Sequence, residues 1–307
     1  MASGGPTVID HVATVGGTAP SVSAESRTAS RRRVSDFEQW RVVTVNQLEH
    51  YVRTYRFLGL LGFVVLISVL TLAFEIDAGT GAVRVAQLFR SSEYLSNFLA
   101  NTGLWVVLAA AFFGGDALSV DFSTGAGYYI LVLPVRRSVL LAGRYTAATL
   151  LAVAIVGVYY LIGTIGAIYF FGAGTIPWGA LVESLGAAAL FTLAALSVAF
   201  CVSAFVRSPS AGVLITVLVL YVGFTTLQSV VELAGVEPWW SLSYAGGTMA
   251  AILDTDFVHV QLIPLGEDQF YTIWSATASE GLAIMVAYLA VFLPFSAYLY
   301  QRQESTG

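Results

Sequence analysis

The sequence predicts an all-α polytopic membrane protein: six transmembrane helices preceded by an amphipathic interfacial helix, with both termini cytoplasmic. Three observations support this fold class. The 307 residues are 57% hydrophobic and only 11% charged, with a mean hydropathy of +0.78, whereas a soluble domain is typically about 25% charged. Six long segments of the sequence contain no charged residue. The arginines concentrate in alternate connections between those uncharged gaps. A water-soluble enzyme is excluded, because a soluble fold of this length could not hide so much apolar surface.

The N-terminal region divides into a tail and a helix. Residues 1–34 are rich in Gly, Ser, Thr and Ala, and no apolar core of a secretory signal appears before Phe57. We expect this tail to be disordered and cytoplasmic. In residues 35–56, apolar side chains recur at three- or four-residue steps with charged residues opposite them. This pattern predicts an amphipathic helix lying in the membrane interface, started by Ser35 and Glu38 as a capping box.

The permease domain follows from the uncharged gaps and is expected over residues 35–302, before a short tail at 303–307. A helix needs about 20 apolar residues to cross the hydrocarbon core, and every gap is close to this length or longer. The longest, with 38 residues between Arg144 and Glu183, is interrupted by glycines and a proline and is assigned one helix. The six expected spans cover residues 57–74, 97–115, 146–171, 180–206, 211–231 and 280–300.

The distribution of arginine predicts the orientation. All 14 basic residues are arginine, and if the N-terminus is cytoplasmic only Arg84 and Arg90 lie outside. Cytoplasmic connections of membrane proteins carry an excess of basic residues, so both termini are expected in the cytoplasm and the protein in the cell membrane. The remaining segments hold nine of the 19 acidic residues and four tryptophans near the expected outer interface.

Few residues could carry chemistry. Asp116, Glu183 and Glu280 lie at expected helix ends, where carboxylates mainly set the boundary of a span. The three histidines have no metal-ligand spacing, and the single cysteine, Cys201, is expected to pack within a span. We therefore expect no catalytic residue, no cofactor-binding residue and no metal ligand. The sequence also has no phosphate-binding loop, so any ATP hydrolysis would belong to a partner chain.

The connection between the second and third spans, residues 116–137, carries the most specific pattern. It holds an acid, a glycine, a proline and two arginines, and a Gly-basic pair follows it: Asp121, Gly125, Pro134, Arg136, Arg137 and Gly143-Arg144. This order resembles the permease subunits of type 2 ABC exporters, where an acid, a glycine four residues later, an apolar run, Leu-Pro-Val-Ser-Arg and Gly-Lys follow one another. The chain differs by Asp for Glu, Ala-Gly for Thr-Leu, and Arg for Ser.

The resemblance implies that the 116–137 loop forms a coupling helix that docks on an ATP-hydrolysing subunit. Its coupling residues would be Asp121, Gly125, Pro134, Arg136 and Arg137. Pro134 would redirect the chain, Gly125 would permit close backbone approach, and the two arginines would offer charge to a partner. A basic loop that only sets topology is the alternative.

The resemblance also implies the function. The chain would be the membrane-spanning subunit of an ATP-driven ABC transporter, an exporter, with an ABC ATP-binding subunit and a second permease, in a homodimer or heterodimer, as partners. Membrane lipid is a further partner, and the net charge of −5 argues against nucleic acid. Residues 232–279 would form outer helices or a re-entrant hairpin over the exit path, or else an acidic surface loop. A non-transporting membrane scaffold or assembly factor is the alternative function.

Overall fold

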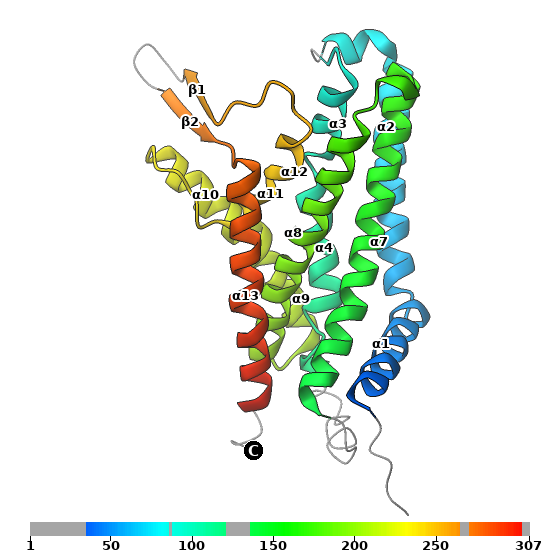
Figure 1. The fold of residues 1–307 in the computed structure, drawn as a ribbon, viewed down its shortest axis with the longest axis vertical. Coiled ribbons are helices and arrows are strands. Elements are labelled where there is room, and N and C mark those ends of the chain that lie inside the picture. Colours follow the sequence, from blue (N-terminus) through cyan, green and yellow to red (C-terminus); the bar gives the residue numbers. More distant parts are fainter. Residues whose placement is uncertain (1–34, 86–87, 121–135, 265–269, 303–307) are drawn as a thin grey trace, which may run out of the picture. The chain divides into compact units, whose positions relative to one another are not determined.

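The computed structural model of the protein describes residues 35–85, 88–120, 136–264 and 270–302. Within these ranges, six helical stretches are long and apolar enough to cross a membrane, which confirms the predicted number of spans (Figure 1). They cover Arg56–Asp77, Ser91–Gly114, Arg137–Phe171, Trp178–Phe205, Pro209–Leu233 and Ala278–Arg302.

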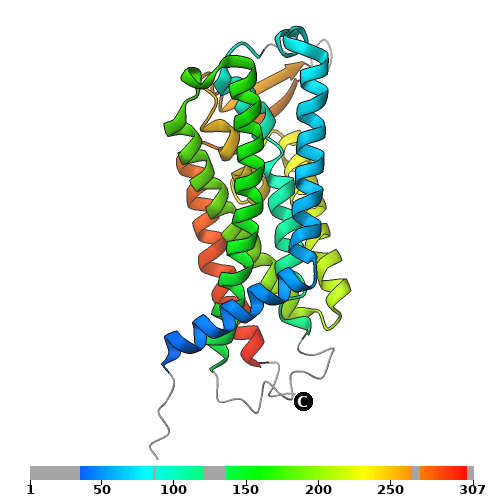
Figure 2. The same cartoon turned by 90° about the vertical axis from the view of Figure 1, so that its right-hand side faces the viewer.

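The N-terminal helix α1 (Asp36–Arg53) is separate from the helix of the first span, α2 (Arg56–Val85). Ser35 begins α1 by accepting a hydrogen bond from the Phe37 N–H at 3.2 Å. Tyr55 ends it, because its φ of 57° lies in the left-handed region and turns the chain into α2. Figure 2 shows α1 crossing the lower part of α7 (Arg137–Phe171) obliquely. The inner face of α1 therefore packs on the third span.

The helices α7 and α8 (Trp178–Phe205) form the centre of the bundle. About 61% of the most apolar stretch of α7 and 67% of that of α8 are buried inside the protein. The corresponding share is only 11% in the sixth span, α13 (Ala278–Arg302). The helices α1, α2 and α4 (Thr102–Gly114) pack on α7, and α13 packs on α8. The outer faces of the first, fifth and sixth spans are therefore available to lipid or to another subunit.

Two spans are interrupted. The second consists of α3 (Ser91–Leu99) and α4, separated by Ala100 and Asn101, where Asn-Thr-Gly is a run of poor helix formers. The fifth consists of three helices in series, the middle one a π-helix: α9 (Pro209–Val217), η3 (Leu218–Gly223) and α10 (Phe224–Leu233). At the first interruption, the Phe98 carbonyl accepts a hydrogen bond from the Tyr159 hydroxyl of α7. Backbone groups released from a helix must find such partners in an apolar environment.

Charges lie inside two helices that were expected to start after them. The second span begins at Ser91 rather than near residue 97, and Glu93 accepts hydrogen bonds from the Phe89 and Arg90 N–H groups at 2.7 and 3.1 Å. A carboxylate is favourable in the first turn of a helix. The third span begins at Arg137 rather than near residue 146, and Arg144 is buried within it.

In the described part of residues 232–279, two short helices and two strands lie between α10 and α13. The helices are α11 (Leu242–Gly246) and α12 (Thr248–Ala251), and the strands β1 (Val260–Pro264) and β2 (Phe270–Trp274) pair antiparallel, with Val260 opposite Trp274. The strands differ from the outer helices, re-entrant hairpin or surface loop predicted from the sequence. Figure 1 shows them beside α10 and above α13, at the end of the bundle away from α1.

Candidate functional site

The predicted coupling residues are only partly described. Asp121, Gly125 and Pro134 lie in residues 121–135, outside the described ranges. Arg136 directly precedes α7, and its Nη1 lies 2.9 Å from the Asp36 Oδ2 of α1, in an exposed ion pair. Arg137 begins α7, and its guanidinium lies 5.8 Å from the ring centroid of Tyr300. The two arginines thus stand where the first helix, the third span and the end of the sixth span meet.

An ion pair with a buried carboxylate lies where the 116–137 loop leaves the second span. The Asp116 carboxylate is 3% exposed and pairs with the guanidinium of Arg56 at the start of α2. On the far side of the loop, the buried Arg144 Nη1 donates to the Ala117 carbonyl at 2.8 Å. Both flanks of the loop are therefore held by charged side chains, and these contacts join the first three spans.

Tyr51 adds a connection from α1 to the same place. Its hydroxyl donates to the Phe113 carbonyl of α4 at 2.7 Å, and its ring is fully enclosed. Burial raises the pKa of the Tyr51 phenol, and the nearby Asp116 carboxylate raises it further. The phenol therefore remains protonated and keeps its role as a donor.

Two glycines allow close helix packing around the loop. A Cβ on Gly143 of α7 would lie 2.6 Å from the Val43 Cγ1 of α1, and one on Gly212 of α9 would lie 2.1 Å from the Gly115 carbonyl oxygen. Only glycine allows these approaches. Helix α9 therefore touches the backbone at the end of α4, and α7 packs closely against the Val43 side chain of α1.

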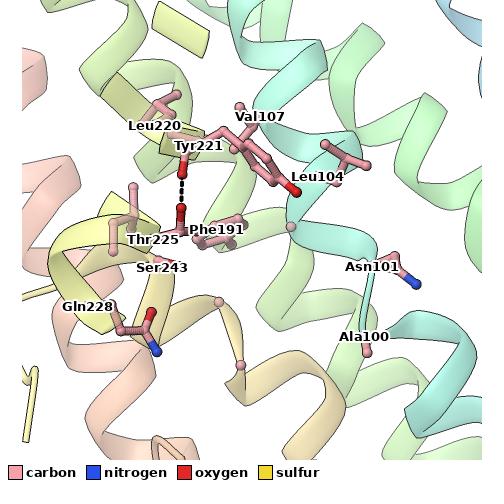
Figure 3. Close-up of a pocket in the computed structure, with 15 residues that line it drawn as sticks. Ala100, Asn101, Leu104, Val107, Phe191, Leu220, Tyr221, Thr225, Gln228 and Ser243 are labelled. Carbon is pink, nitrogen blue, oxygen red and sulfur yellow. Dashed lines mark hydrogen bonds between the residues drawn. The ribbon is translucent and has the colours of Figure 1, made fainter. Parts of the chain in front are cut away.

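A cavity of about 320 Å³ lies between the two interrupted spans (Figure 3). The α3–α4 break contributes Asn101 to it, the π-helix contributes Tyr221, and α10 contributes Gln228. The described residues that line it carry no formal charge and combine apolar surface with hydroxyl and amide groups. Irregular backbone at membrane depth is tolerated where it borders a cavity, and π-helical turns often mark functional positions.

A second cavity, of about 550 Å³, lies between α2 and the second span. It is mostly apolar, with Phe63, Trp105 and Tyr159 on its walls, and it shares Asn101 and Leu104 with the first cavity. The break in the second span therefore separates two hollow regions of the bundle.

Comparison with known proteins agrees with this arrangement. A family model described as "ABC-2 family transporter protein" matches residues 88–254, more than half of the chain. The chain belongs to the ABC-2 transporter family. It is accordingly a multi-pass membrane subunit of the transporter type, and the match includes the 116–137 loop and all the residues that line the first cavity. No curated protein matches the chain.

Two structural features of this ABC-2 protein could not be predicted from the sequence pattern alone. Asp116 lies just after α4, where the sequence predicts the end of the second span, and it is also the buried ion-pair partner of Arg56. The sequence carried one sign of such pairing, because an acidic and a basic residue, Asp116 and Arg144, flank the loop that carries the family pattern. The interruption at Asn101 also had a signal, because polar Asn-Thr is rare inside a span.

Proposed function

We propose that this chain is the membrane-spanning half of an ATP-driven exporter, working as a dimer of permease subunits with separate ATP-binding subunits. In this proposal the ATPase docks on the 116–137 loop, with Asp121, Gly125, Pro134, Arg136 and Arg137 as the coupling residues. The observation that carries it is the anchoring of both flanks of that loop. Because Asp116 and Ala117 are fastened to Arg56 and Arg144, a push on the loop would move the first three spans together.

The orientation follows the same proposal. The described arginines at the loop end lie on α1, at the start of α2, around the start of α7, after α8 and at the end of α13. Figure 1 places the start of α7 and the end of α13 at one end of the bundle, together with α1. An excess of arginine favours the cytoplasmic side, which is where an ATP-hydrolysing partner must bind.

The cavity between the second and fifth spans supplies a place for substrate. Its lining is neutral, so the substrate that it suits is an uncharged or amphipathic molecule rather than an ion. Movement of α4, which carries both the cavity wall and Asp116 after its end, would change the cavity together with the loop.

The test is charge reversal at the loop. Arg137→Glu should reduce co-purification of the ATP-binding subunit from native membranes, or uncouple ATP turnover from transport, since opposed like charges in an interface cost several kcal/mol. Arg53→Glu is the matched control, because Arg53 lies on α1 and pairs only at the exposed surface with Glu49. Unchanged association, turnover and transport in Arg137→Glu would leave the loop as a topology signal and favour the scaffold alternative.

A second variant separates partner docking from internal pairing. Asp36→Asn removes the ion-pair partner of Arg136 without changing the charge of the loop. If Arg136 acts on the ATPase, Arg136→Glu should impair association and Asp36→Asn should not. Equal effects of the two variants would assign Arg136 to the contact between α1 and α7 instead.

A further inference from the structure

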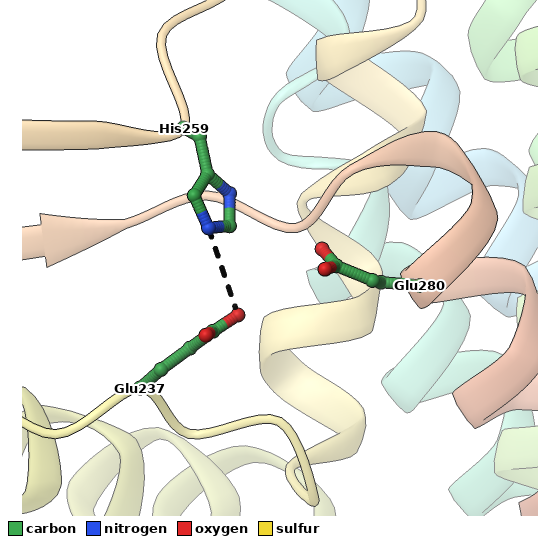
Figure 4. A group of neighbouring side chains, drawn as sticks. All are labelled: Glu237, His259 and Glu280. Carbon is green, nitrogen blue, oxygen red and sulfur yellow. Dashed lines mark ion pairs between the residues drawn. The ribbon is translucent and has the colours of Figure 1, made fainter.

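Three potential metal ligands from distant parts of the sequence meet at the end of the bundle away from α1 (Figure 4). Glu237 lies between α10 and α11, His259 directly precedes β1, and Glu280 is in the first turn of α13. One ligand atom from each lies within 4.8 Å of the others, and His259 Nε2 is 3.8 Å from Glu237 Oε1. The cluster therefore combines an imidazole with two carboxylates and joins three separate elements.

The ring of His259 is held in the orientation that a metal ligand needs. Its Nδ1 lies 2.8 Å from the Ser275 carbonyl oxygen, which can only accept, so Nδ1 carries the hydrogen. Nε2 then faces the Glu237 carboxylate, and the ring packs edge-on to Trp274 at a centroid distance of 5.7 Å. An imidazole that donates its second N–H to a backbone carbonyl is the usual outer-shell arrangement of a metal-bound histidine.

Both carboxylates are also positioned by hydrogen bonds. Glu237 Oε1 accepts from the Tyr244 hydroxyl at 2.6 Å, and Glu280 Oε2 accepts from the Thr277 N–H at 3.0 Å. A carboxylate has about four acceptor sites, so these bonds orient the groups and leave capacity for a ligand. The lone pair of a neutral imidazole and two carboxylates are all acceptors, and a cation placed between them satisfies all three.

We propose that Glu237, His259 and Glu280 bind a divalent transition metal ion of the Zn²⁺ class. An imidazole nitrogen with carboxylate oxygens suits zinc, whereas Mg²⁺ and Ca²⁺ prefer oxygen ligands throughout. Tetrahedral zinc places its ligand atoms about 3.4 Å apart. The ligand atoms therefore close by on the order of 1 Å on binding, which the exposed Glu280 side chain can provide. The ion would tie the end of the fifth span and the strand pair to the start of the sixth span.

The experiment measures zinc binding by the purified full-length chain in detergent, by competition with a fluorescent zinc chelator. Wild type should bind one Zn²⁺ per chain, and His259→Ala and Glu237→Gln should each weaken binding at least about 10-fold. The matched control is His11→Ala/His50→Ala, which removes the other two histidines and should leave the affinity unchanged. Equal affinity in wild type and His259→Ala, or loss of binding in the control, would overturn the proposal.

A stability measurement guards against a folding artefact. In EDTA, wild type and His259→Ala should unfold at similar temperatures. Added ZnCl₂ should then raise the Tm of wild type alone, because a ligand that binds only the folded chain stabilises it. MgCl₂ and CaCl₂ at the same concentration should leave both unchanged. A wild-type Tm that does not respond to zinc would contradict the site, and none of these readouts depends on an ATPase or on transport.

Discussion

The ion pair of Arg56 with the buried Asp116 should respond asymmetrically to the loss of either partner. Removing one member of a buried ion pair costs about 3–5 kcal/mol when the other is left uncompensated. Here the side chain of Asp116 is 3% exposed and that of Arg56 is 37% exposed. Arg56→Met leaves a carboxylate away from water, so we expect a loss of about 3 kcal/mol. Asp116→Asn leaves a guanidinium that can reach water, so the expected loss is only about 1 kcal/mol.

The single cysteine makes the assay direct. Cys201 is buried in the fourth span, so a thiol-reactive fluorogenic dye reports unfolding of the detergent-solubilised chain without added labels. For a chain of this size, each kcal/mol of lost stability lowers the Tm by on the order of 2 °C. Arg56→Met should therefore lower the apparent Tm by about 6 °C and Asp116→Asn by about 2 °C.

Two further variants test the reasoning. Arg53→Met removes an arginine whose ion pair with Glu49 is exposed, and it should change stability by less than about 0.5 kcal/mol. Arg56→Met/Asp116→Leu should be more stable than Arg56→Met alone, because no charge is then left unpaired. If Asp116→Asn costs as much as Arg56→Met, the carboxylate is not the group that depends on its partner, and the argument from burial fails.

Three other outcomes are expected. In a cysteine-free background, a cysteine introduced at the exposed Val236 should react with an impermeant thiol reagent in intact cells. A cysteine at the exposed Ser138 should not react. The reverse labelling would invert the proposed orientation. Gly212→Ala should cost about 1–3 kcal/mol in thermal unfolding, because its Cβ would meet a backbone carbonyl, whereas Gly59→Ala meets nothing and should be neutral or stabilising. Ser243→Phe should partly fill the cavity of Figure 3 and reduce transport while the ATPase still co-purifies, and normal transport would exclude that cavity from the path.

The number of spans was predictable because long uncharged gaps have few interpretations in a chain this apolar. The boundaries were less predictable, because a charged residue does not necessarily end a span. Glu93 satisfies a helix start, and Arg144 reaches a carbonyl inside the protein, so both lie within helices. Whether a charge lies in a span depends on its partner, and the partner of Arg144 is 27 residues away.

The sites were harder to predict than the spans. The loop pattern identified the family, but the ion pair that anchors it joins residues 60 positions apart. The cluster of Glu237, His259 and Glu280 has no local spacing at all, because its members are brought together by the strand pair and by the start of α13. A search for histidine pairs cannot find a site that has one histidine.

The separation of Arg56 from Asp116 has a consequence during biosynthesis. Arg56 is at the start of the first span, and its partner is made 60 residues later. At a synthesis rate of 5–20 residues per second, the arginine waits about 3–12 s before the carboxylate exists. Gly143, against which α1 packs, follows later still. The nascent first span must therefore keep its arginine hydrated at the membrane surface, and α1 can take its final position only after the third span has begun to emerge.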